Sequence, residues 1–145
     1  MDAETRLLRY RVVEGLVLLA APAVEQIEYM DTHGWKHRIE LLIGFMNWEH
    51  ELLPRLERDG ALSPEALKRT EAVNEALVAL GDEFAHQYPV PEPILALRDD
   101  GIRTDPRWEM IRSLARQALD AFGDLGVPIP RLLDEDYNIR RQDAP

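Results

Sequence analysis

The residues of this sequence whose types and spacing could bind a metal ion are its histidines and the carboxylates near them. His33 and His37 are four residues apart and Glu40 follows three residues later, while Glu83 and His86 have the Glu-x-x-His spacing of di-iron helical bundles. Such a site needs ligands that point into a bundle, but helical spacing places these side chains on or beside polar faces. A second Glu-x-x-His is also absent. We therefore expect solvated side chains here, with no metal ion and no cofactor.

Nucleophilic catalysis has little support in the sequence. Ser63 and Ser113 are the only serines, and neither lies in a Gly-x-Ser-x-Gly turn. Ser63 precedes a proline and an acid, which is the pattern of a helix start, and no glycine-rich phosphate loop is present. The chain has no cysteine, which excludes disulfides, thiolate metal sites and cysteine nucleophiles within it. The sequence therefore leans away from an enzyme without deciding the question.

The stretch 34–57 predicts the element around which the fold is organised. At about 100° per residue its apolar side chains fill an arc of roughly 220°, which is too wide for one side of a surface helix. We therefore expect a central helix over 34–57 that is the most buried element. The apolar arc consists of Trp35, Ile39, Leu41, Leu42, Ile43, Phe45, Met46, Trp48, Leu52, Leu53 and Leu56.

Five polar residues of this predicted helix are the candidate binding residues. Arg38, Glu49 and His50 fall inside the apolar arc, whereas His37 and Glu40 lie in the narrow polar strip. A long arginine near a helix start can extend past apolar neighbours to reach water, so we expect Arg38 to snorkel in this way. We expect His50, which has apolar helical neighbours, to lie in the core or at its boundary.

Glu49 is the sharpest of these candidates. Its neighbours three and four positions away are all apolar, so its own helix offers no counter-charge. We predict a buried Glu49 paired with an arginine from another helix. Such a pair can be an internal strut, or Glu49 and His50 can line a cleft that meets a ligand or partner. The candidate arginines are Arg6, Arg9, Arg11, Arg112 and Arg116.

Cap residues and apolar spacing predict further elements on both sides of this helix. Ser63 and Asp105 are each followed by proline, a strong signal for a helix start. The last long helix has a one-sided apolar stripe, so we expect it to form a wall of the fold and not its centre. The predicted elements are a helix from Asp2 or Thr5 to Ala20, a segment 22–30 that can be helix or strand, and helices 64–88 and 106–126.

Glycine and proline residues define the predicted connections. Asp59 and Gly60 indicate a turn, and three prolines within 89–93 indicate an extended connection. A short helix over 94–98 is expected before a turn at 99–101. Gly126 is expected to end the last helix.

Length and composition favour one globular domain. The chain has 145 residues, of which 46% are hydrophobic and 30% charged, values that argue against global disorder. We predict an all-α domain over 1–130, a small irregular bundle of about four to six helices around the central helix 34–57. A tail over 131–145 is expected to be partly ordered.

The net charge of −10 bears on partners and location. An acidic chain without a basic stripe lacks the electrostatic attraction that nucleic acid and anionic membranes provide, so we expect neither as a partner. The first 24 residues faintly resemble a signal peptide, but Asp2, Glu4 and Glu14 interrupt the pattern. We therefore expect a cytoplasmic protein.

These observations favour a non-enzymatic, acidic helical module that docks a basic protein partner, as an inhibitor, an immunity or antitoxin-type protein, or an adaptor does. Two alternatives stay open. One is a helical enzyme or small-ligand binder with a pocket around Glu49 and His50. The other is a subunit of a structural homo-oligomer, in which a second copy covers part of the broad apolar arc.

Overall fold

The structure, a computed structural model, describes residues 2–35, 38, 41–42, 52–85 and 98–123. Those residues form six helices and no strand, so the predicted all-α fold is confirmed. The segment 22–30, whose class the sequence left open, is helical after Pro22. The helices are α1 (Ala3–Ala20), α2 (Ala23–Thr32), α4 (Leu52–Arg58), α5 (Pro64–Ala85), α6 (Asp99–Thr104) and α7 (Pro106–Phe122).

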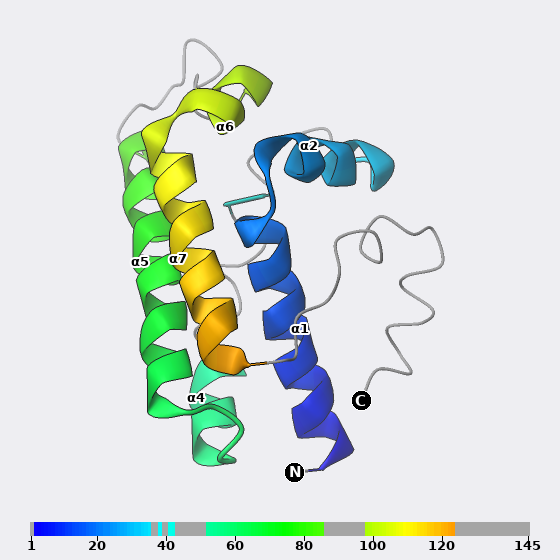
Figure 1. Ribbon diagram of the computed structural model, residues 1–145, viewed down its shortest axis with the longest axis vertical. Helices are drawn as coiled ribbons and strands as arrows, with labels where there is room; N and C mark the ends of the chain where they lie inside the picture. The colour runs from blue at the N-terminus through cyan, green and yellow to red at the C-terminus, as the bar shows by residue number, and fades with distance from the viewer. Residues whose placement is uncertain (1, 36–37, 39–40, 43–51, 86–97, 124–145) are drawn as a thin grey trace.

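Three long helices, α1, α5 and α7, run along the long axis of the molecule (Figure 1). α7 contacts both α5 and α1 and runs antiparallel to each of them. α2 crosses the end of this group where α1 ends, and α6 lies at the same end, immediately before α7. α4 lies at the opposite end and contacts α1 and α5. The crossing of α2 makes the bundle irregular, as predicted.

α1 is buried on most of its sides. Asp2 caps its first turn, because the Asp2 carboxylate accepts a hydrogen bond of 2.7 Å from the backbone N–H of Thr5. The apolar run towards Ala20 leaves little polar surface, so the second half of this helix is largely covered. The buried residues of α1 are Thr5, Tyr10, Val12, Val13, Glu14, Leu16, Val17 and Leu19.

The two predicted cap-and-proline starts are confirmed. The Ser63 hydroxyl accepts a hydrogen bond of 3.0 Å from the Ala66 backbone N–H, and the Asp105 carboxylate accepts one of 2.9 Å from Arg107. These side chains satisfy backbone donors that a helix start leaves without partners. The predicted one-sided stripe of α7 is also buried, and its packing against both α1 and α5 gives it a more central place than a wall helix. The stripe includes Trp108, Ile111, Ala115, Ala118 and Phe122.

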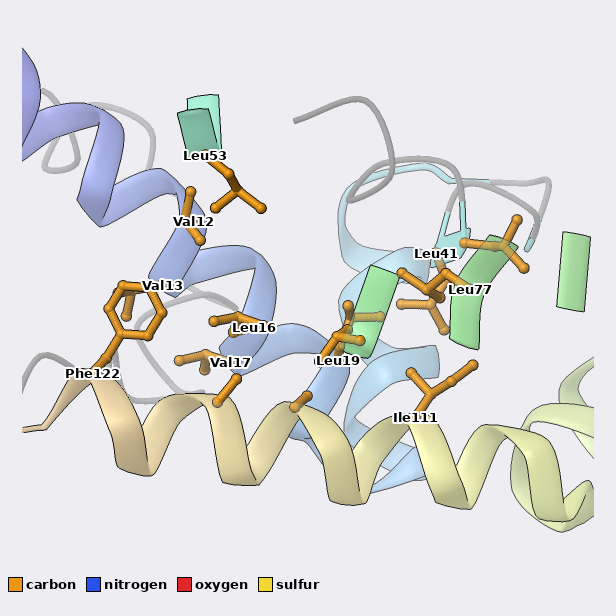
Figure 2. Packing of buried hydrophobic residues seen from close by; sticks show 14 of the residues in the cluster. Val12, Val13, Leu16, Val17, Leu19, Leu41, Leu53, Leu77, Ile111 and Phe122 are labelled. Carbon is orange, nitrogen blue, oxygen red and sulfur yellow. The ribbon is translucent and has the colours of Figure 1, made fainter. Parts of the chain in front are cut away.

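The core lies where α1 meets α7 and continues between α7 and α5. Figure 2 shows Val13, Leu16 and Val17 of α1 on the side facing α7, with Phe122 of α7 extending towards Val13, while Ile111 lies farther along α7, on the side of Leu77. Trp108 is the largest fully buried side chain among the described residues. Burial of this apolar surface is the main stabilising contribution to the fold.

The predicted central helix 34–57 is described only in part. Leu41 and Leu42 are buried, and so are Leu53 and Leu56 in α4, in agreement with the predicted apolar arc. Residues 43–51, with Trp48 among them, lie outside the described residues. The burial of the helix as a whole and its central place therefore stay predictions.

Two predicted boundaries are wrong. The expected turn at 99–101 is the first part of α6, where acidic side chains suit the positive end of a helix and Ile102 is fully buried. α7 ends at Phe122 and not near Gly126. Gly123 adopts a φ of 85°, a conformation that glycine adopts without strain, and so ends the helix three residues earlier.

Candidate functional site

Arg38 is the one candidate binding residue whose surroundings the structure describes. Glu49, His50, His37 and Glu40 all lie outside the described residues. Whether Glu49 is buried and paired therefore stays a prediction. Among its five proposed partners, Arg9, Arg112 and Arg116 each donate a hydrogen bond to a backbone carbonyl.

The Arg38 guanidinium bridges the end of α2 and the start of α6. It donates hydrogen bonds of 2.8 Å to the Asp99 carboxylate and 2.6 Å to the Asp31 carboxylate, and one of 3.2 Å to the Trp35 carbonyl. Arg38 extends past Trp35, as predicted, but its head group ends at two partly exposed carboxylates, and its side chain is only 14% exposed. The hydrogen bond that Arg38 donates to Asp99, followed by the one that it donates to Asp31, raises the pKa of Arg38 above its ordinary value. Arg38 is therefore a charged connection between two helices.

An aromatic cluster, formed by Tyr29, His33 and Trp35, lies beside this connection. The His33 ring stacks on Tyr29 with ring centroids 4.1 Å apart, and Trp35 meets Tyr29 nearly perpendicularly at 5.3 Å. The His33 Nδ1 atom lies 2.9 Å from the Tyr29 carbonyl oxygen. Each of the three rings is partly exposed. Aromatic side chains that combine an apolar body with a polar tip are enriched in binding interfaces.

The outer face of α2 is acidic. Along it lie Val24, Glu25, Glu28 and Asp31, and α2 contains neither lysine nor arginine. Val24 is 66% exposed and is one of two large hydrophobic residues that stand exposed within the described residues. Glu25 and Glu28 form no ion pair with any described residue. This face therefore presents negative charge around one exposed apolar side chain.

The inner face of α2 carries a buried polar network that sequence reasoning missed. Gln26, which is fully buried, donates hydrogen bonds of 3.0 and 3.1 Å to the carbonyls of Leu18 and Leu19 at the end of α1. Its oxygen accepts one of 3.0 Å from Arg112, which also donates to the Ile102 carbonyl at 3.0 Å. The network joins α1, α2, α6 and α7, and so fixes how α2 is oriented on the bundle.

The Arg112 network reaches water at Glu109. Arg112 is 3% exposed and donates a hydrogen bond of 2.9 Å to the Glu109 carboxylate, which stands at the surface. Arg116 donates to the other oxygen of the same carboxylate at 3.2 Å. The hydrogen bonds from Arg112 and then Arg116 lower the pKa of Glu109 below its ordinary value. The buried cation thus has its counter-charge at the edge of the fold.

The described part of the chain carries no cluster of three or more histidine or acidic side chains that could hold a metal ion. His33 contacts the Tyr29 ring and carbonyl, whereas His37 and His86 lie outside the described residues. Among the described helices none has the length and apolar character needed to span a membrane. The described residues therefore present a surface that carries charge and partly exposed aromatic rings.

Comparisons with known proteins assign no family to this chain. No protein-family model matches it, and neither a curated protein nor a solved structure does. Any functional proposal therefore has to rest on the residues themselves.

Proposed function

We propose that this protein is a non-enzymatic binding module that docks a basic protein partner through the outer face of α2. The observation that carries the proposal is the composition of that face: Glu25 and Glu28 have no ion pair with a described residue, the helix contains no lysine or arginine, and Val24 is exposed, while the third carboxylate, Asp31, is paired with Arg38. Negative charge accelerates association with a basic surface, and the exposed apolar side chain adds area that a partner can bury. The class of function is that of an inhibitor, an immunity or antitoxin-type protein, or an adaptor, acting in the cytoplasm.

The orientation of α2 favours this use. Its inner side is tied to three other helices by the Gln26 and Arg112 network, while on its outer side Glu28 is exposed and Glu25 is half-buried. A rigid face loses little conformational entropy when a partner binds, which leaves more of the contact energy for affinity. By contrast, nucleic acid and anionic membranes would be repelled by this surface.

A matched pair of variants tests the proposal. Glu25→Gln with Glu28→Gln removes two charges from α2, and Glu71→Gln with Glu75→Gln removes two exposed charges from α5. Proteins captured from a lysate of the source cells are identified with wild type as bait, and binding of each purified basic candidate is then titrated. We expect the α2 variant to bind about five- to tenfold more weakly at low salt, since each exposed charge pair contributes up to about 1 kcal/mol.

The α5 variant controls for net charge, because both variants lose the same two charges. Equal weakening by both variants would mean that the partner senses only the overall charge, and the α2 face would be rejected. A partner whose binding does not change with either variant, or does not weaken as salt rises, contradicts the proposal as a whole. Light scattering of the unbound protein separates this reading from a homo-oligomer.

A further inference from the structure

We infer that the outer face of α2 docks an arginine side chain of the basic partner, with its guanidinium against the aromatic cluster at Tyr29 and paired with Glu25, one helical turn earlier. This inference rests on the proposed function and names the chemistry of the partner more narrowly. It distinguishes arginine from lysine, which has the same charge but a compact ammonium group. The two cations differ in shape, and the aromatic cluster responds to that difference.

The first observation is the placement of rings and acid together. Glu25 lies four residues before Tyr29 on α2, so the two side chains are neighbours on one helix face. Tyr29, His33 and Trp35 follow at the end of the helix, each with part of its surface exposed. A planar guanidinium can stack on such rings while it donates two hydrogen bonds to a carboxylate, whereas an ammonium cannot do both as well.

The second observation is the lack of a described counter-ion beside Glu25 and Glu28. α2 contains no lysine or arginine, and the carbonyls of Tyr29, Met30 and Asp31 at its end accept hydrogen bonds from the backbone N–H groups of His33, Trp35 and Gly34. Arg38 occupies the side of this end that faces α6, where it bonds to Asp31 and Asp99. Glu25 in the first turn of α2 and Glu28 in its middle are paired with no cation from any described residue. A cation from outside is therefore favoured there.

The third observation is that the molecule already uses both halves of this recognition internally. The Arg9 guanidinium lies 4.9 Å from the centroid of the Phe122 ring while it donates to the Ala61 carbonyl. Arg38 is held between two carboxylates beside Trp35. This protein thus contains one arginine that stacks on a ring and another that pairs with carboxylates. The outer face of α2 presents a ring, Tyr29, and a carboxylate, Glu25, to a single arginine from outside.

Two synthetic peptides test the inference by fluorescence anisotropy. They are identical except at four positions, which are arginine in one peptide and lysine in the other. We expect wild type to bind the arginine peptide about fivefold more tightly than the lysine peptide. The preference should fall below about twofold in Trp35→Leu and in Tyr29→Leu, and should persist in Glu71→Gln with Glu75→Gln. Circular dichroism reports whether the ring variants keep their helical content.

A measurement on unmodified protein covers the case in which the ring variants do not fold. In NMR spectra the indole N–H resonance of Trp35 should shift when the arginine peptide is added, whereas that of the fully buried Trp108 should not. Equal affinities of wild type for the two peptides, or no shift of the Trp35 resonance, would overturn the arginine inference. If the α2 charge variant then still bound both peptides more weakly than wild type, the proposed function would stand. Failure of both peptides to bind would overturn both proposals.

Discussion

Two arginines tie α2 to α6, one at the surface and one in the interior. Arg38 joins the Asp31 and Asp99 carboxylates, which are 63% and 41% exposed. Arg112 joins the neutral oxygens of Gln26 and Ile102, which are buried. An arginine therefore joins α2 to α6 in both places, through charged acceptors where water is near and through neutral acceptors in the interior.

The difference shows what each connection contributes. When a surface pair is broken, water can solvate the carboxylates that remain, so little free energy is lost. When a buried donor is removed, the acceptors that it leaves behind have no water to replace it, and each costs about 1 to 3 kcal/mol. Arg112 is therefore expected to determine the stability of the α2 orientation, whereas Arg38 adds a smaller, adjustable contribution.

The largest expected effect comes from Arg112→Ala. It leaves the Gln26 oxygen and the Ile102 carbonyl without their donor, and we expect a loss of about 3 kcal/mol or more in the free energy of unfolding. Urea denaturation followed by circular dichroism measures this loss. A loss below about 1 kcal/mol would contradict the assignment of Arg112 as a buried connection.

A double-mutant cycle sharpens this prediction. Gln26→Leu removes the donor to Leu18 and Leu19 and an acceptor of Arg112 in one step. Because the two residues share one hydrogen bond, the double variant with Arg112→Met should be less destabilised than the sum of the single variants by about 1 kcal/mol. Additive effects would show that the two residues stabilise α2 independently.

The next effect in size is that of Arg38→Met. Its partners are partly exposed, so we expect the free energy of unfolding to fall by only about 0.5 to 1 kcal/mol. The loss should shrink further at 1 M salt, since ions screen surface pairs, whereas the loss for Arg112→Ala should stay constant. Similar losses and similar salt dependence for the two variants would remove the distinction between the connections.

Local signals in the sequence predicted the helices well. The capping roles of Asp2, Ser63 and Asp105 depend on residues within three positions, and all three hold in the structure. The residues 99–101 were misread because Asp-Asp-Gly is a common turn composition. Only the tertiary burial of Ile102 distinguishes the start of α6 from such a turn.

The candidate site was less accessible because its pairs are distant in sequence. Arg38 and Asp99 are 61 positions apart, and Gln26 and Arg112 are 86 apart. A helical projection identifies Gln26 and Arg112 as polar residues on buried faces, by the argument that selected Glu49, but it names no partner. Periodicity predicts which polar residues need a partner, whereas the packing of helices decides which partner each receives.

The smallest expected effect is the acid dependence of the Arg112 network. Arg112 and Arg116 lower the pKa of Glu109 below its ordinary 4.5, so in the range below that value the unfolded chain binds more protons than the folded chain. The contribution of Glu109 to stability is therefore fully present above pH 4.5 and is lost as the pH falls through the folded pKa. Wild type should be more stable than Glu109→Gln at pH 7, and the gap should close as the pH falls below 4.5 and through the folded pKa. Asp2, whose pKa is lowered by its hydrogen bond to Thr5, keeps both proteins acid-sensitive, so only the difference between their unfolding curves reports on Glu109. A gap that stays constant with pH would show that the Glu109 carboxylate does not stabilise the buried arginine.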